Sequence, residues 1–470
     1  MIIAGKARWR AWHGMRIILP VFLLAGVGAG LSPSPNNEPP ARLIIVDPGH
    51  FHAALLQKEM YPSLDRRVSV FAPLGPELLD YLNRIALFNA RRDNPTSWDL
   101  DIHTSSDPMG DMLRSPPGDV VVFTGRNRGK IDRILASLSA GLNVFADKPW
   151  IISSADMPKL ERALDLADQK RLVAYDIMTE RYEVTSELQR ILVNDPALFG
   201  RLQPGSSRNP GVWARSVHHV MKAVAGVPLR RPAWFFDIEE YGEGLADVGT
   251  HVIDLVQWTA FPGEAIDYRA DVRVLDGRRW PLAITQKQFE QVTGEPAFPP
   301  ALASRVHGGS FEYFCNNSVD YTLRGVYVRL EIVWNWEAPA GSGDSYEAVF
   351  RGSKASVQIR QGKPENYIPQ LYVAPAREAD RAEVFARLQE KIDQLQQQWP
   401  GLGMARTEKE ARIVIPEKFR VGHEAHFAQV ANQFFAYLRN PQRIPSWERP
   451  NMLAKYYIST RGVEFGKERR

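Results

Sequence analysis

Cysteine is almost absent from this chain of 470 residues, since Cys315 is the single one. One cysteine excludes both a disulfide framework and a zinc site built from cysteines. An excess of charge is also lacking beyond the N-terminus. The formal net charge is +4. The first 29 residues contain four basic residues, Lys6, Arg8, Arg10 and Arg16, and no acidic residue. The rest of the chain is therefore neutral, which gives nucleic-acid binding little support.

Long apolar runs are absent as well. The longest stretch at the N-terminus, Ile17 to Leu31, has about 15 residues, fewer than the ~20 that a membrane-spanning helix needs. Hydrophobic residues make up 44% of the chain and charged residues 24%, as in ordinary globular proteins. A mainly disordered chain, a collagen-like fibre and a polytopic membrane protein are thereby excluded. The length predicts two to three domains.

The N-terminus has the order of a secretory signal: a basic segment, an apolar segment and small residues. Val27 and Ala29 are placed for cleavage after Ala29. We therefore expect a signal peptide over 1–31, a Pro-rich linker over 32–40 and export to the periplasm or the medium. An uncleaved membrane anchor is the alternative, and Met15 is an alternative start. No cysteine follows the apolar run, which excludes lipid attachment there.

Residues 41–170 alternate strands with helices, which predicts a parallel sheet with right-handed crossovers. Expected strands are 43–46, 68–72, 100–103, 119–124 and 143–146, and expected helices are 51–60, 77–88 and 130–140. The first turn keeps one glycine, Gly49, of the three in a phosphate-binding fingerprint G-x-G-x-x-G. The second strand ends at Ala72 without the acid that takes ribose hydroxyls. By itself this turn is also compatible with an ordinary strand–helix connection.

Two ordered motifs carry a resemblance to the glucose–fructose oxidoreductase / inositol dehydrogenase / MocA (Gfo/Idh/MocA) family. The first is DVVVFTGRNRGKIDRILASLSAGLNVFADKP over 119–149, which ends in Asp147-Lys148-Pro149 where that family has Glu-Lys-Pro. The second is GEGLADVGTHVIDLVQW over 242–258, and a weaker third is YEAVFRGSKASVQI over 346–359. The resemblance implies an N-terminal Rossmann dinucleotide-binding domain followed by a C-terminal α+β domain with a largely antiparallel sheet.

The spacing of the second motif places Asp247, His251 and Asp254 on one face of a helix. A histidine beside an acid can take an alcohol proton while hydride leaves the same carbon. Lys148 follows a buried strand, at the sheet edge where ligands bind. The resemblance implies that Lys148, Asp247 and His251 are catalytic. It also predicts substrate binding by Lys148, His251, Asp254 and Arg181, although Asp254 could equally orient the helix.

The cofactor implied is NAD or NADP, and the residues expected to bind it are Gly49, His50, Phe51, Thr124, Asn127, Asp147 and Lys148. NADP carries a ribose 2′-phosphate that needs an arginine, and Arg126 and Arg128 could each supply one, so NADP stays an alternative. We favour NAD. No metal is expected, because His423 and His426 lack the H-E-x-x-H spacing. His218 and His219 are interpreted as a pair in a loop.

Residues 171–470 are predicted to form the α+β domain. Strands are expected at 171–175, 326–336, 346–351 and 355–360, in a sheet through which subunits could pair as a homo-oligomer. A charged helix over 376–398 marks an insertion at about 365–420. Helices over 421–439 and 449–465 are expected to close the chain.

These expectations lead to an exported NAD(P)-dependent oxidoreductase that moves hydride between the nicotinamide and a sugar, a polyol or a related carbohydrate. Two alternatives stay open at this point. One is a glycosidase that uses NAD in a transient oxidation–elimination cycle. The other is a catalytically retired protein that binds a ligand, which the degenerate first turn motivates.

Overall fold

A six-stranded parallel sheet forms the N-terminal half of the part that the computed structural model describes, residues 39–469 without 225, 226 and 229. The strand order is β3-β2-β1-β4-β5-β6, so the order reverses between β1 and β4. This is the order of doubly wound nucleotide-binding sheets, which bind ligands at that reversal. The strands are β1 (Leu43–Val46), β2 (Arg67–Ala72), β3 (Asp99–Thr104), β4 (Val120–Phe123), β5 (Asn143–Ala146) and β6 (Ala174–Asp176).

Both faces of this sheet are covered. Leu43 and Ile45 of β1 belong to one apolar core, and Ile44 and Val46 belong to the other. Burial on both faces explains why β1 and β4 are almost continuously apolar and β-branched rather than alternating. The helices of this half are α1 (His52–Leu56), α2 (Pro76–Ala90), α3 (Pro108–Arg114), α4 (Lys130–Ser139) and α5 (Met157–Lys170). The helix expected over 51–60 is shorter than predicted, because α1 ends at Leu56.

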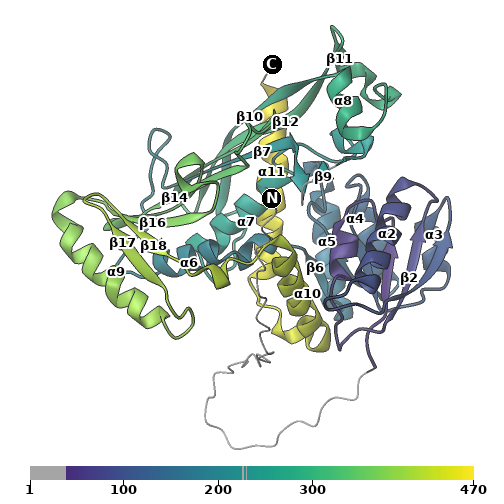
Figure 1. The fold of residues 1–470 in the computed structure, drawn as a ribbon, viewed down its shortest axis with the longest axis horizontal. Helices are drawn as coiled ribbons and strands as arrows, with labels where there is room; N and C mark the ends of the chain where they lie inside the picture. The colour runs from purple at the N-terminus through teal and green to yellow at the C-terminus, as the bar shows by residue number, and fades with distance from the viewer. Residues whose placement is uncertain (1–38, 225–226, 229, 470) are drawn as a thin grey trace, which may run out of the picture. The chain divides into compact units, whose positions relative to one another are not determined.

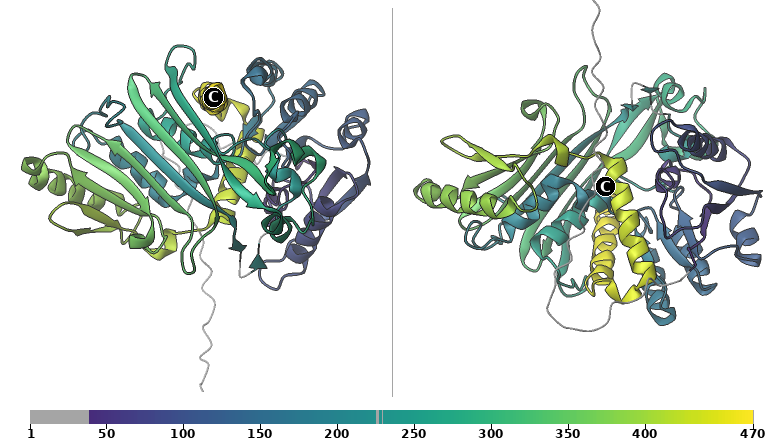
Figure 2. Two further views of the ribbon diagram at one scale, coloured as in Figure 1. Left: turned by 90° about the horizontal axis from the view of Figure 1, so that it is seen from above. Right: turned by 60° about the horizontal axis from the view of Figure 1, so that its bottom comes forward.

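A ten-stranded, largely antiparallel sheet forms the second half. Its order is β10-β12-β13-β7-β14-β15-β16-β18-β17, with β11 beside β12, and the pairing of β13 with β7 is parallel. Figure 2 shows these strands side by side, with α9 at one end. The strands are β7 (Val212–Met221), β10 (Val272–Thr285), β11 (Val306–His307), β12 (Ser310–Leu323), β13 (Val326–Glu337), β14 (Ser345–Arg351), β15 (Ala355–Gln361), β16 (Gln370–Pro375), β17 (Gly403–Arg406) and β18 (Ala411–Val414).

The helices of the second half lie beside this sheet and between the two sheets. They are α6 (Val184–Val193), α7 (Val248–Ala260), α8 (Gln286–Thr293), α9 (Arg381–Leu395), α10 (His423–Arg439) and α11 (Glu448–Glu468). A short pair, β8 (Ala223–Val224) with β9 (Val227–Pro228), stands apart. Short 3-10 turns include η2 (Thr179–Tyr182) and η3 (Ala233–Phe236). The expected fold class is confirmed.

The last two helices connect the halves (Figure 1). Phe427 and Phe434 of α10 enter the core on one face of the parallel sheet. Tyr456 of α11 enters the core on the other face, whereas Ile458 and Val463 of the same helix belong to the core of the large sheet. The C-terminal helices therefore complete the cores of the N-terminal half, although they lie far beyond the domain boundary expected at residue 170.

The structure adds detail to two of the expected boundaries, at residue 170 and around residues 365–420. The N-terminal sheet extends past residue 170, because its last strand is β6. The segment at about 365–420 contains β16, α9, β17 and β18, which extend the edge of the large sheet. The expected signal peptide over 1–31 and most of the linker over 32–40 lie outside the described residues. Among the helices that are described, none is long and apolar enough to cross a membrane.

Candidate active site

Lys148 joins the two halves of the chain. It follows β5 at the carboxyl edge of the parallel sheet, and its bond to Pro149 is cis. The Lys148 ammonium donates to the main-chain oxygen of Asp247 at 2.9 Å and to its Oδ1 at 2.5 Å. Asp247 occupies the N-cap position of α7, without a capping hydrogen bond from its side chain. The two motifs that carry the family resemblance thus meet directly, with both side chains about 11% exposed.

Asp247 is ionised in this setting. Burial alone would raise the pKa of its carboxyl group, but the nearby Lys148 ammonium and the hydroxyl of Tyr241 lower that pKa to about 2. Tyr241 donates to Oδ1 of Asp247 at 3.0 Å. The carboxylate therefore fixes the position of the Lys148 ammonium, and the Lys148 side chain keeps 11% of its surface exposed for contact with a ligand.

His251 lies on α7, one turn after Asp247. Burial, followed by repulsion from Lys148 and His423, holds the pKa of His251 well below its usual range, so the imidazole is neutral near neutral pH. Among the described residues its Nδ1 is buried without a hydrogen-bond partner. The expected orientation of His251 by Asp247 is thus not found, because the Asp247 carboxylate bonds to Lys148 and Tyr241 instead.

Arg181 and Asp254, expected to bind substrate, are paired with each other. Arg181 donates through Nε and Nη2 to the two Asp254 oxygens at 2.6 and 2.7 Å. The Lys455 ammonium lies 3.4 Å from Asp254 and 2.6 Å from Asp176. With Asp254 only 2% exposed, these contacts form an internal network between η2, α7 and α11. This pairing is compatible with the helix-orienting role of Asp254, and substrate binding by the two residues stays a prediction.

Asp147 is held by the first turn. Its Oδ2 lies 3.2 Å from Nδ1 of His50, and its Oδ1 lies 2.7 Å from Nδ1 of His52. Burial opposes ionisation, but the two histidines hold the pKa of Asp147 well below its usual range. The buried Lys130 ammonium donates to the Asp147 main-chain oxygen at 3.1 Å. Asp147 is therefore engaged by protein groups instead of standing free for a cofactor.

The turn after β4 is bonded to the loop before α7. Asn127 donates through Nδ2 to the Tyr241 main-chain oxygen at 2.6 Å and accepts from Lys130 at the same distance. The His50 amide donates to the Thr124 main-chain oxygen at 3.0 Å. The ring of the next residue, Phe51, lies 4.3 Å from the His50 ring. Asn127 and Thr124 therefore act here by holding the first turn and the Tyr241 loop in place.

A narrow cradle lies at the point where the strand order reverses. A Cβ atom on Gly49 would lie 3.2 Å from the Trp234 ring, and one on Gly125 would lie 2.9 Å from the Asp47 main-chain oxygen. The basic side chains of Arg126, Lys130 and Arg133 line the adjoining hollow. Among the described residues the Nε of Arg133 is buried without a partner. This donor would suit an anionic group, but the Trp234 ring covers Gly49 and Asp47 also lines the hollow, so the turn is closed to a pyrophosphate in this conformation.

Three residues of this region were missed in the sequence. Tyr241 and Trp234 lie in irregular segments without a recognisable pattern, and only the Gly-rich stretch beginning at 242 marked their neighbourhood. Glu180 lies in η2, next to Arg181, and no motif singled it out. Burial, followed by repulsion from Glu183, raises the pKa of Glu180 to about 7, and Lys148 partly opposes that shift. Glu180 is therefore a titratable group beside Lys148.

His218 and His219 lie on strand β7, so their assignment to a loop was wrong. A buried β-strand was not expected there because the pair is polar. Their Nδ1 atoms lie 3.1 and 3.0 Å from the two oxygens of Asp344, to which Lys222 also donates. This second histidine–aspartate cluster therefore already contains a lysine ammonium.

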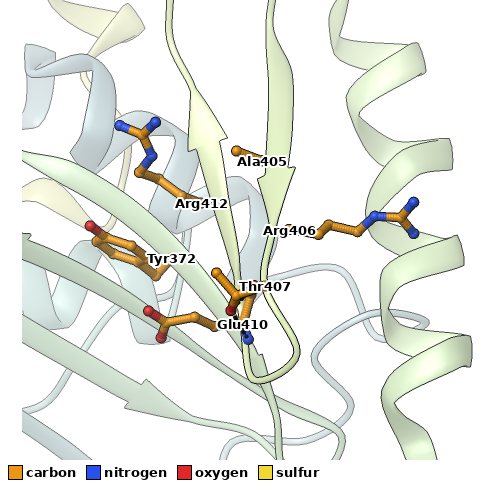
Figure 3. Close-up of a pocket in the computed structure, with 6 residues that line it drawn as sticks. All are labelled: Tyr372, Ala405, Arg406, Thr407, Glu410 and Arg412. Carbon is orange, nitrogen blue, oxygen red and sulfur yellow. Dashed lines mark hydrogen bonds between the residues drawn. The ribbon is translucent and has the colours of Figure 1, made fainter.

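A pocket also lies at the β17 edge of the large sheet (Figure 3). It is formed by β16, β17 and β18 and by the turn between the last two strands. Glu410 there forms an ion pair with Arg360 at 2.7 Å. The lining residues are Tyr372, Ala405, Arg406, Thr407, Glu410 and Arg412.

Residues 188–467 match the family model described as "Putative oxidoreductase C terminal domain". The chain belongs to this oxidoreductase family. A crystal structure described as a "putative oxidoreductase from Parabacteroides merdae ATCC 43184" has 42% sequence identity and a TM-score of 0.90, covering 92% of this chain and 98% of that one. No match was found among the curated proteins.

More distant structures share the fold. A levoglucosan dehydrogenase in complex with NADH has 14% identity and a TM-score of 0.55, covering 92% of this chain and 98% of that one. A 3-ketoreductase from Actinomadura kijaniata, in complex with TDP-benzene and NADP, has 12% identity and a TM-score of 0.52, covering 90% and 96%. At these identities the likeness establishes the two-sheet architecture.

Proposed function

We propose that this member of the family is an NAD(P)-dependent oxidoreductase that transfers hydride between the nicotinamide and a hydroxyl-bearing carbon of a sugar or polyol. The observation that carries the proposal is the contact of Lys148 with Asp247, which places an ammonium group and the neutral His251 at the ligand-binding edge of the parallel sheet. The levoglucosan dehydrogenase and the 3-ketoreductase, which share the fold, support the carbohydrate class.

The cradle would hold a dinucleotide once the Trp234 ring leaves Gly49. Gly49 and Gly125 would let its pyrophosphate approach the backbone, and Arg133 offers a buried donor without a partner among the described residues. Because Trp234 packs on Gly49, its ring would have to stack on the bound nucleotide or move aside. When bound, the nicotinamide supplies the acceptor or donor for the hydride.

The protein groups handle the oxygen and its proton. In the direction of oxidation, the neutral His251 takes the hydroxyl proton as the carbon–hydrogen bond breaks and the carbonyl forms. The Lys148 ammonium donates to the same oxygen and stabilises its developing negative charge. Asp247 holds the ammonium in place through two hydrogen bonds. In reduction the same groups return the proton.

We propose NAD as the preferred cofactor. Arg126 lies 3.2 Å from Glu77 and 3.6 Å from Asp47, and Arg128 lies 3.2 Å from Glu240. Both arginines already face carboxylates, so binding a 2′-phosphate would require breaking these pairs. Measured affinities for both dinucleotides test this choice. A preference for NADP of about tenfold, or ~1.4 kcal/mol, would contradict it.

The catalytic assignment is tested by measuring turnover with a panel of sugars and polyols, together with dinucleotide affinity. We expect Lys148→Met to lower turnover by ~10²–10³-fold with little change in dinucleotide affinity. We expect His251→Asn to lower it by ~10²–10⁴-fold. Lys354→Met is the matched control, because that lysine pairs with Glu383 at a distant exposed site.

Thermal unfolding must accompany these measurements, because Lys148→Met leaves the buried Asp247 carboxylate without its cation. Lys148→Arg keeps the charge and serves as the folding control. Normal turnover in both Lys148→Met and His251→Asn would refute the site assignment. Failure to bind either dinucleotide would refute the proposed function itself.

A further inference from the structure

Three potential metal ligands converge where the first turn meets the end of β5. One ligand atom from each of His50, His52 and Asp147 lies within 4.8 Å of the other two. His52 is 7% exposed and Asp147 is 5% exposed, so two members of the cluster are buried. The three residues come from two segments about a hundred positions apart, which the parallel pairing of β1, β4 and β5 brings together.

The Asp147 carboxylate has no lysine or arginine partner among the described residues. The Lys130 ammonium donates to the Asp147 main-chain oxygen and to Asn127, not to the Asp147 carboxylate. Lys148 bonds to Asp247. The two carboxylate oxygens face one imidazole nitrogen each. A buried carboxylate requires a compensating charge or several hydrogen-bond donors, and a cation at this point would supply the charge.

The spacing of the donor atoms fits a small cation. Zinc binds histidine nitrogen and carboxylate oxygen at about 2.0–2.2 Å, which places neighbouring ligands of a tetrahedron ~3.3 Å apart. The observed nitrogen–oxygen distances are 3.2 Å for His50 and 2.7 Å for His52. The first distance runs to Oδ2 and the second to Oδ1. An ion bound through Oδ2 would have His50 at the required distance, and the His52 ring would have to turn from Oδ1 toward that ion.

We propose that His50, His52 and Asp147 form a binding site for a divalent transition-metal ion of the zinc class. Two neutral imidazoles and one carboxylate are the donor set that such ions prefer. The His50 side chain is 31% exposed and gives the ion a path from solvent. The remaining coordination position is left for water or a ligand oxygen. This site lies beside Lys148 in the sequence and goes beyond the proposed hydride transfer.

The chain contains its own comparison site. His218, His219 and Asp344 also place two histidine nitrogens on one carboxylate, at 3.1 and 3.0 Å. There, however, Lys222 donates to the carboxylate and supplies the positive charge. The two clusters have the same residue types, and we expect metal binding at the cluster without the lysine.

The test uses the full chain carrying a tag without histidines. The protein is stripped with a chelator, equilibrated with Zn²⁺ and analysed for bound metal and affinity. We expect one Zn²⁺ per chain. His52→Gln and Asp147→Asn should weaken binding by more than the ~10–100-fold that loss of an outer partner of a metal ligand costs. His219→Gln, the matched control, should leave stoichiometry and affinity unchanged.

A second measurement does not depend on the folding of variants. X-ray absorption of the zinc-loaded natural chain should show scattering from two imidazole rings and from light oxygen ligands at about 2.0–2.2 Å. Absence of bound Zn²⁺, unchanged binding in Asp147→Asn, or a spectrum without imidazole would each overturn the proposal. Loss of binding in His219→Gln alone would assign the metal to the other cluster and would overturn it as well.

Discussion

His251 is partly buried beside a cation, and this environment determines how its protonation follows pH. Burial and the Lys148 ammonium hold the pKa of His251 well below 6.5, while Asp254 and Asp247 oppose that shift. A proton-accepting histidine with a lowered pKa stays neutral and active as the pH falls through 6.5. We therefore expect no loss of kcat/KM for oxidation that depends on His251 around that pH.

The measurement is a pH profile of the natural chain and of His251→Asn. An unperturbed histidine would titrate near pH 6.5, and the lowered pKa of His251 moves the effect of this variant to more acidic pH. Glu180→Gln is a needed comparison, because the pKa of Glu180 is raised to about 7. An inflection near pH 6.5 that disappears in His251→Asn but persists in Glu180→Gln would contradict the prediction.

Asp254 should matter for stability more than for substrate binding. It is 2% exposed and bonded to Arg181 through both oxygens. Asp254→Asn removes the negative charge that faces two cations, Arg181 and Lys455. We expect this to lower the free energy of unfolding by about 3–5 kcal/mol. Urea unfolding measures this loss, and Asp101→Asn, at an exposed pair with Arg67, should cost less than ~1 kcal/mol.

The same pair predicts a dependence on acid. Burial would raise the pKa of Asp254, but Arg181 and Lys455 lower it from 3.8 to about 2. A carboxyl group whose pKa is lowered by folding stabilises the fold above its unfolded pKa and loses that contribution as the pH falls toward 2. The difference between the natural chain and Asp254→Asn should therefore shrink below about pH 4. An equal difference at pH 7 and pH 2.5 would argue against this ion pair.

Helices and strands could be predicted from the sequence where a segment is apolar throughout or apolar along one face. The run VVVF predicted β4, and the apolar face of Ile131, Ile134 and Leu138 predicted α4. The pattern was less informative where contacts distant in the chain decide the structure. His218 and His219 read as a polar loop, but β7 is paired on both sides by β13 and β14. The order of the ten strands has no local signal at all.

The candidate site shows the same division. Lys148, Asp247 and His251 were found because two motifs keep their family order. Three sets of contacts were not predicted: Tyr241 with Asp247, the two histidines with Asp147, and Arg181 with Asp254. Each of them joins residues that are far apart in the sequence or lie in irregular segments. Spacing reveals which residues share a helix face, whereas the partner of a buried charge depends on how the helices and sheets pack.

Helix α11 packs closely on β10, and this approach depends on glycine. A Cβ atom on Gly277 would overlap the main-chain oxygen of Gly462, which cannot rotate away. We expect Gly277→Ala to destabilise the fold by about 1–3 kcal/mol, because the helix must shift. Gly403→Ala is the control, since the nearest atom to its added Cβ would be 3.9 Å away. Equal thermal stability of the two variants would contradict the predicted close packing.

Across the full chain, the closing helices make the two halves depend on each other. Phe427 and Phe434 of α10 complete one core of the parallel sheet, and α11 contributes to cores in both halves. The contact of Lys148 with Asp247 crosses the same junction. Pairing of subunits through the large sheet stays a prediction. The geometry of the candidate site therefore requires the C-terminal helices as much as the motifs themselves.

The N-terminal segment 1–31 predicts that the protein is exported. The basic, apolar and small segments of 1–31 favour a cleaved signal, so the N-terminus of the protein in the cell envelope should lie near Leu31. Ala29→Phe should block cleavage because the cleavage site requires small residues, whereas Ser34→Phe in the linker should not. An exported oxidoreductase must retain its dinucleotide, so we expect cofactor to be released when the purified protein is denatured. N-terminal sequencing and fractionation decide: intact Met1 in membranes would indicate the anchor, and intact Met1 in the soluble cytoplasm would refute export.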